Sequence, residues 1–173
     1  MTSGVELVRQ AVVERLRAQG VQAEAAYSRE WAGRYQGAVV AVGVRGFAST
    51  SAGLGSYLGA VWDREAGTDR EIYGRQAELT LALDAYAPRE AGAAGCLAAL
   101  EAAHDALTVS PAAGLRPGRM DWGEARFDPD SGMFLQRGSL QCGAFFVAAV
   151  EAETGLLLSF RLKGVPWIEH DST

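Results

Sequence analysis

The chain has 173 residues, of which 49% are hydrophobic and 21% are charged, and its formal net charge at pH 7 is −5. This composition is that of an ordinary globular domain and excludes a disordered or fibrous protein. The negative charge argues against specific nucleic-acid binding, because a binding groove needs clustered positive charge to neutralise phosphates. At roughly 150 residues per domain, the length predicts a single domain over residues 1–173.

The N-terminal part predicts a helix followed by two strands. Ser3 and Glu6 have the spacing of a capping box. Apolar residues then recur at helical spacing as far as Gly20, which suits a C-terminal cap. Alternation over residues 21–27 predicts the first strand, and the valine-rich residues 38–48 predict the second.

The middle of the chain predicts a loop and a long hairpin. Small polar residues at 49–59 predict a flexible loop, and residues 58–62 and 71–86 predict two paired strands joined through residues 64–70. Residues 49–70 together are therefore interpreted as a flexible loop and hairpin arm. The second strand has one apolar face that marks it as central, made of Ala77, Leu79, Leu81, Leu83 and Ala85. Its length predicts an end that projects past the sheet, with a bend at Gly74.

Pro88 ends this strand, and a second helix follows. Its predicted buried face consists of Leu97, Leu100, His104 and Leu107. Three more strands are predicted at residues 120–127, 133–150 and 156–163, with the turns DPDSG and AETG between them and a frayed tail at residues 165–173. This order predicts an α+β domain: a mostly antiparallel sheet, two main helices packed on one face, and a projecting β-hairpin arm.

The residues with reactive side chains do not form a recognisable catalytic or metal site. Cys96 and Cys142 are too few for a disulfide framework and lack metal-ligand spacing, so we expect two buried thiols. His104 and Asp105 are adjacent on a helix, so their side chains diverge by about 100° and are not expected to pair. Cys96 lies about 12 Å from His104 along the helix axis, too far for a thiolate–imidazole pair. We expect no catalytic residues, no cofactor and no metal.

Two short motifs are better explained as structure than as ligand sites. The DPDSG stretch at residues 128–132 resembles the start of a calcium loop but lacks the later carboxylates, which favours a hairpin turn. The glycines at residues 53–59 do not have dinucleotide-binding spacing and open no amphipathic helix, which favours a loop. Glu6 and Arg9 interrupt the first apolar stretch, so neither a signal peptide nor a membrane span is predicted.

Aromatic and arginine side chains gather around the hairpin arm. Such residues are enriched at the centres of protein interfaces. The alternative is that some of them form core at the base of the hairpin. The candidate interface with another subunit or a partner protein consists of Phe47, Tyr57, Leu58, Trp62, Arg70, Tyr73 and Arg75.

The order of elements resembles that of the tail terminator (tail completion) proteins of long-tailed bacteriophages and of phage tail-like particles, including contractile ones. The resemblance is carried by the stretches RQAELTLALDAYAP, GAAGCLAALEAAHDAL and FFVAAVEAETGLLLSFRLKG and covers residues 3–164. It implies a homo-oligomeric ring, typically of six subunits, that caps the tail tube and ends its polymerisation. It also implies a surface for a sheath or a head–neck connector protein, a location in a virion or tail-like particle assembled in the bacterial cytoplasm, and no catalytic residues.

Three other readings stay open. The chain could be another neck or connector component, or a tube-like subunit that forms filaments. It could be a small hydrolase, if His104 meets Glu78 or Asp84 in a pocket. It could also be a small-molecule binding module, which needs a concave apolar cavity with a few polar groups.

Overall fold

The computed structural model describes residues 4–26, 34–52, 54–112, 114–150 and 157–162. Two α-helices lie within these residues, α1 (Gly4–Ala18) and α2 (Gly92–Val109), and a short 3-10 turn, η2 (Leu54–Ser56), lies between two strands. The strands are β1 (Ala23–Glu24), β2 (Val39–Ser51), β3 (Tyr57–Asp63), β4 (Thr68–Ala87), β5 (Leu115–Trp122), β6 (Arg126–Asp128), β7 (Met133–Gln136), β8 (Gly138–Val150) and β9 (Leu157–Leu162). All nine strands belong to one sheet. The predicted α+β class is confirmed.

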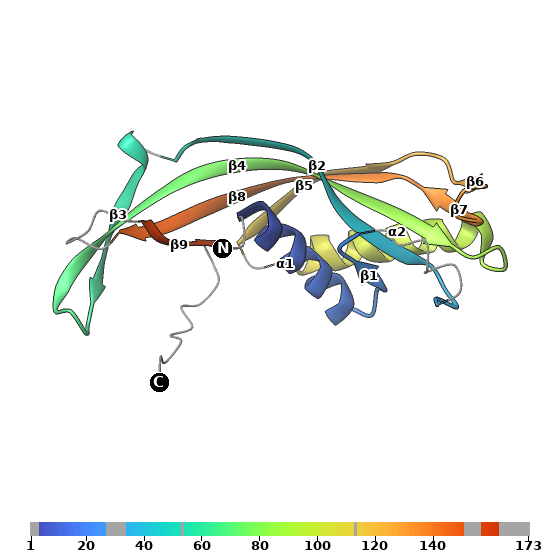
Figure 1. The fold of residues 1–173 in the computed structure, drawn as a ribbon, viewed down its shortest axis with the longest axis horizontal. Helices are drawn as coiled ribbons and strands as arrows, with labels where there is room; N and C mark the ends of the chain where they lie inside the picture. The colour runs from blue at the N-terminus through green and yellow to red at the C-terminus, as the bar shows by residue number, and fades with distance from the viewer. Residues whose placement is uncertain (1–3, 27–33, 53, 113, 151–156, 163–173) are drawn as a thin grey trace.

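The sheet is organised around β4, which runs through almost the whole length of the molecule (Figure 1). One edge of β4 pairs antiparallel with β2 over residues 75–86 and with β3 over residues 68–73. The other edge pairs antiparallel with β8 over residues 72–82 and with β7 over residues 85–87. The pairing of β1 with β2 is parallel. The sheet is therefore mostly antiparallel, as predicted, and β4 is its central strand.

Both helices pack on the same, concave side of the arched sheet (Figure 1). The predicted apolar face of β4 lies under them, and each of its five side chains is at most 2% exposed. Val8, Val12 and Leu16 of α1 are fully buried in the same hydrophobic cluster. Burying each such leucine or valine contributes about 1.5–3 kcal/mol, so this cluster is the main source of stability.

The prediction of the buried face of α2 is confirmed at Leu100 and Leu107. It was wrong at Leu97, which is 40% exposed. His104 is only half-buried. The helix is rotated so that the smaller Cys96 and Ala103 enter the core beside Leu100. Small side chains let a helix approach a sheet closely. The rotation of α2 about its axis therefore follows from this close packing and not from the spacing of its leucines.

The prediction of a loop at residues 49–59 was wrong at most positions. Ser49 and Ser51 still pair with β4, and β3 already begins at Tyr57. Pairing with a long central strand satisfies the backbone groups of this segment, and it outweighs the loop preference of its small residues. Within the segment predicted to be a mobile loop, the described residues outside the strands are Ala52 and η2.

Other predicted boundaries also changed. The first strand was predicted at residues 21–27, but among the described residues 21–26 the strand covers only β1. The strand predicted at residues 120–127 divides into β5 and β6, and the one predicted at 133–150 is interrupted at Arg137. Ser3 of the capping box, the AETG turn and the tail at residues 165–173 lie outside the described residues.

Gly138 gives a sharp test of packing between the sheet and α2. A Cβ added there lies 2.7 Å from the Leu83 carbonyl oxygen and 3.3 Å from a methyl group of Leu100. Because the backbone oxygen cannot move without disturbing β4, we expect Gly138→Ala to lower the free energy of unfolding by about 1–3 kcal/mol. Urea denaturation measures this loss. The matched control is Gly123→Ala, since a Cβ at Gly123 meets nothing within 4 Å; equal losses in both variants would contradict the packing.

Candidate interaction surface

Large exposed hydrophobic side chains are concentrated in one segment. Seven of the ten in the described chain lie between residues 44 and 62, namely Val44, Phe47, Leu54, Tyr57, Leu58, Val61 and Trp62. Residues 57–73 form a hairpin made of β3, a turn and the beginning of β4, and it projects beyond the two helices (Figure 1). We call this hairpin the arm. A cluster of exposed hydrophobic side chains marks an interaction surface more often than single, scattered hydrophobic side chains do.

The turn of the arm is built by Asp63 and Gly67. The Asp63 carboxylate accepts hydrogen bonds from the backbone N–H groups of Glu65 and Ala66 at 3.0 and 3.1 Å. Gly67 takes a positive φ of 62°, which glycine adopts without strain. The hydrogen bonds from Ala66 and Glu65, assisted by the charge of Arg70, lower the pKa of Asp63. The Arg70 guanidinium lies 2.6 Å from the same carboxylate and ties the two strands together.

One face of the arm continues the sheet face that the helices cover elsewhere. Tyr57 and Tyr73 lie opposite each other on it, with ring centroids 5.6 Å apart. Strand alternation places Trp62, 59% exposed, on the same face. At the base of the arm, the half-exposed ring of Phe47 lies 6.2 Å from that of Phe146. This face therefore presents four aromatic rings that neither helix covers, those of Phe47, Tyr57, Trp62 and Tyr73.

The opposite face of the arm is also apolar. Leu58 lies directly over Gly74, where a side chain would not fit. Val61 pairs with Arg70 on this second face and is 48% exposed. Gly74 was predicted as a bend, and its clearer role is to leave room for Leu58. A hairpin with apolar side chains on both faces is suited to burial between partner surfaces.

The predicted interface residues thus fall into two groups. Phe47, Tyr57, Trp62, Tyr73 and Arg75 share the helix-side face, whereas Leu58 and Arg70 belong to the other. The alternative that these residues are core applies in part to Tyr73, which is half-buried and donates a hydrogen bond to Glu71 at 2.5 Å. That hydrogen bond raises the pKa of Tyr73. Val61 was not predicted as an interface residue, although the alternation in YLGAVWD is the signal that could have identified it.

The histidine-centred hydrolase site is not assembled. His104 and Asp105 were expected not to pair, and this was wrong: His104 Nδ1 lies 3.3 Å from Asp105 Oδ1. Glu78 and Asp84 point to the sheet face opposite the helices, since the alternate residues of β4 are buried under them. Asp84 there forms an ion pair with Arg45 at 2.6 Å.

Both cysteines are buried free thiols, as predicted. The Cys96 thiol lies 3.5 Å from the Ala85 carbonyl and 3.4 Å from that of Phe134, at hydrogen-bond distance for sulfur. Burial raises the pKa of Cys96 and of Cys142 to about 11 in each case. Both thiols therefore stay protonated near neutral pH, and a protonated thiol is a poor nucleophile and metal ligand.

The DPDSG stretch is a hairpin turn between β6 and β7, as predicted. The Asp128 carboxylate accepts hydrogen bonds from the backbone N–H groups of Asp130 and Ser131, each at 3.3 Å. Hydrogen bonding from Ser131 lowers the pKa of Asp128. Within the described residues no group of three or more histidine, cysteine, aspartate or glutamate side chains is placed to hold a metal ion.

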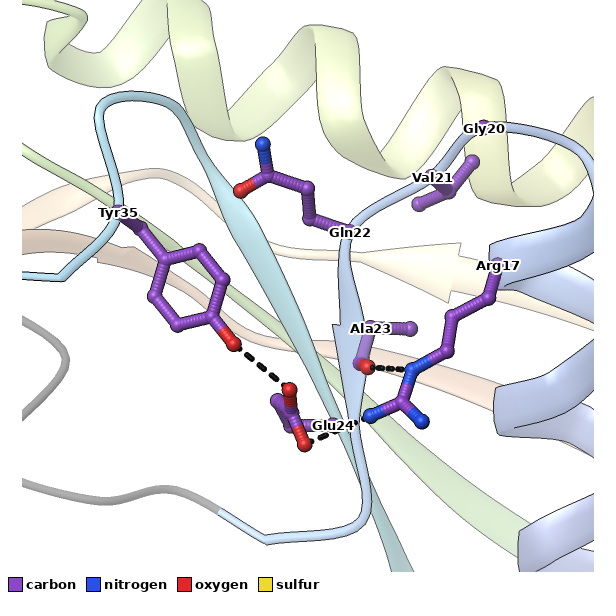
Figure 2. Close-up of a pocket in the computed structure, with 7 residues that line it drawn as sticks. All are labelled: Arg17, Gly20, Val21, Gln22, Ala23, Glu24 and Tyr35. Carbon is purple, nitrogen blue, oxygen red and sulfur yellow. Dashed lines mark hydrogen bonds and ion pairs between the residues drawn. The ribbon is translucent and has the colours of Figure 1, made fainter.

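A pocket of about 300 Å³ lies between the end of α1 and the segment before β2 (Figure 2). It is lined by residues 17, 20–24 and 35, and its charged and hydroxyl groups bind one another. Glu24 accepts hydrogen bonds from Arg17 at 2.7 Å and from Tyr35 at 2.6 Å, and the second of these raises the pKa of Tyr35. Because the charged groups and the tyrosine hydroxyl of this pocket already bind one another, they are not free to bind a ligand.

Neither helix in the described part of the chain is both long and apolar enough to cross a membrane. No family model matches the chain, and a search of curated proteins finds no match.

Proposed function

We propose that this protein is a structural assembly protein of the tail-terminator type, which forms a ring, of six copies, that caps a tail tube and ends its polymerisation. The observation that supports this proposal best is the arm, which is apolar on both faces and lies away from the core. A two-stranded hairpin is only marginally stable in water. The arm therefore gains its full stability against a partner.

The open edges of the sheet also suit a capping role. Among the described residues, β2 has a partner beyond β4 only at Val40 and Ala41, and β3 pairs only with β4. Unpaired strand edges accept strands from other chains. A cap must match the rim of the tube on one side and refuse further tube subunits on the other. An edge that is used by a neighbouring copy is no longer available to a tube subunit.

Growth of tail tubes tests the proposal directly. Tube subunits purified from the same particle are allowed to polymerise, this protein is added in excess, and fresh tube subunits follow. We expect the tubes to keep the length they had at the time of addition, with a ring of density at one end in negative-stain images. Tubes that continue to lengthen after the addition would reject the proposal.

Tube growth, together with the mass of the protein in solution, distinguishes the other structural roles. Another neck or connector component would bind a tube end or a completed cap without stopping growth. A tube-like subunit would form filaments by itself, so its mass in solution would rise steadily with concentration. A terminator reaches a fixed mass and stops. A sheath or head–neck connector protein is the partner we propose for the outer side of the ring.

A further inference from the structure

We propose that two rows of β-bulges form a bending device that fixes the angle at which the arm leaves the sheet, and that this angle determines whether copies close a ring. A β-bulge is an extra residue in one strand opposite its neighbour, and it bends the strand. The statement about the ring deepens the proposed function and rests on it. The statement about the bend concerns a single chain and does not.

The first row of bulges crosses the sheet near the middle of β4. Arg45 is the extra residue of β2, and it lies opposite the step from Thr80 to Leu81. On the other side of β4, residues 118–119 of β5 lie opposite the single residue Gln141 of β8, and Gln141 pairs with Thr80. The bulges of β2 and β5 are therefore at the same level, although β4 and β8 separate these two strands.

The second row crosses the sheet at the base of the arm. Leu58 is the extra residue of β3, opposite the step from Ile72 to Tyr73. β9 has an extra residue opposite the step from Ala149 to Val150 of β8, and Ala149 pairs with Ile72. These two rows contain all four register irregularities of the described sheet. Because strands on both sides bend at the same level, each row bends the whole sheet and not one strand alone.

The extra residues lie on the face of the sheet opposite the helices wherever their side chains are described. Arg45 forms its ion pair with Asp84 on that face, and Leu58 belongs to the same face of the arm. In β5, Arg119 lies 3.4 Å from Asp121, which sits between two residues that pack on the core. Each extra residue lengthens this outer face by about 3.4 Å, the rise of one strand residue. The sheet must therefore curve toward the helices, as the arch in Figure 1 shows.

The position of the arm depends on both bends because the arm lies beyond them. In Figure 1 it curves away from one end of the arched sheet. The bends are made of strands paired by backbone hydrogen bonds, so they hold the arm at one angle, as a flexible loop would not. A ring closes only when the rotation between copies divides a full turn, about 60° for six copies, and other rotations give open filaments. The angle of the arm is therefore a means of selecting closure.

Deleting Arg45 and Arg119 together tests the first row. In β2 the deletion makes Val44 and Gly46 neighbours and leaves their pairs with β4 unchanged, so only the extra residue is lost. The matched control replaces both arginines by alanine, which removes the same side chains and keeps both bulges. Circular dichroism confirms that the variants are folded. If the double deletion does not fold, each single deletion is measured in the same way.

The bend is measured as the distance between two spin labels in one chain. Cysteines that replace the exposed Arg64 and Asp130 carry the labels, in the turn of the arm and in the turn at the opposite end of the sheet. The two native cysteines are buried and do not compete for the label, and an excess of unlabelled protein removes distances between copies. The distance should lengthen by about 3 Å or more in the deletion variant and stay unchanged in the alanine control.

The tube-growth experiment measures the effect of the angle on assembly. The deletion variant should no longer stop tube growth, whereas the alanine control should stop it as the wild type does. An unchanged label distance in the deletion variant would overturn the bending device. A longer distance with normal capping would show that the angle does not determine ring closure. If the wild type itself does not stop growth, the proposed function and the statement about the ring fail, and the label distance still decides whether the bulges set the bend.

Discussion

Replacing Tyr57 and Trp62 together by serine should abolish self-association and tube capping while leaving the domain folded. The two side chains are 44% and 59% exposed, so the isolated chain gains little from them. An aromatic ring at the centre of an interface contributes about 2 kcal/mol. Losing both rings should therefore raise the dissociation constant on the order of a thousandfold.

The folded domain should tolerate this change because its core lies elsewhere. The hydrophobic cluster is formed by the helices and by the strands beneath them, with β4 contributing from Ala77 onward, and none of its described members lies in the arm. Removing the edge contact between Tyr57 and Tyr73 should lower the free energy of unfolding by about 0.5–1.5 kcal/mol. Urea denaturation measures that loss, and light scattering measures the loss of association in the same sample.

A matched control distinguishes the arm from exposed aromatic surface in general. Phe127→Ser removes a ring that is 38% exposed at the opposite end of the sheet (Figure 1), and it should leave association unchanged. If the double arm variant unfolds, or loses more stability than a core substitution, the arm belongs to the core and the interaction surface has to be sought elsewhere.

The central part of the sheet could be predicted from the sequence because burial and strand periodicity are directly linked there. Leu79, Leu81 and Leu83 alternate with mostly polar residues, and a period of two leaves only one way to bury all three in a sheet. Pro88 supplies no backbone N–H and marks the end of the strand. These local rules required no knowledge of the partner strands.

The segment between Ser49 and Gly59 shows where local rules fail. Glycine, serine and threonine have a loop preference, yet Ser51 is paired because Arg75 of the longer β4 lies opposite it. That opposition depends on the register of a distant strand, and strand preference is itself largely set by neighbours. Composition alone could not show how far β2 would extend.

The residues of the candidate surface were largely predicted from the sequence, but their arrangement on the arm was not. Aromatic residues around the arm were identified from the sequence, whereas their division between two faces depends on the bulge between Tyr57 and Gly59 and on the pairing register. The exposure of Leu97 on α2 was not predicted, because leucine spacing assigned this residue to the core. A leucine among alanines looks buried by spacing, and only the close approach of Cys96 and Ala103 to the sheet turns it outward.

Leu81→Ala should cause the largest loss of stability among the single substitutions considered for this chain. Leu81 is fully buried at the middle of β4, with Val44 of β2 and Leu140 of β8 as its neighbours in the ladder. Strands on both sides and helices above leave the site little freedom to collapse. The cavity should lower the free energy of unfolding by about 2–5 kcal/mol, a large part of the 5–15 kcal/mol that is usual for a domain, as an order of magnitude.

Val61→Ala is the matched control, since it truncates a β-branched residue of the same sheet that is 48% exposed. It should change the free energy of unfolding by no more than about 0.5 kcal/mol. Comparable losses for Leu81→Ala and Val61→Ala in urea denaturation would contradict the assignment of the core to the helix-covered half of β4. At low temperature, where Leu81→Ala remains folded, it should still associate with wild-type strength because the exposed side chains of its arm are unchanged. The core variant should thus lose stability and keep assembly, and the arm variant should lose assembly and keep stability.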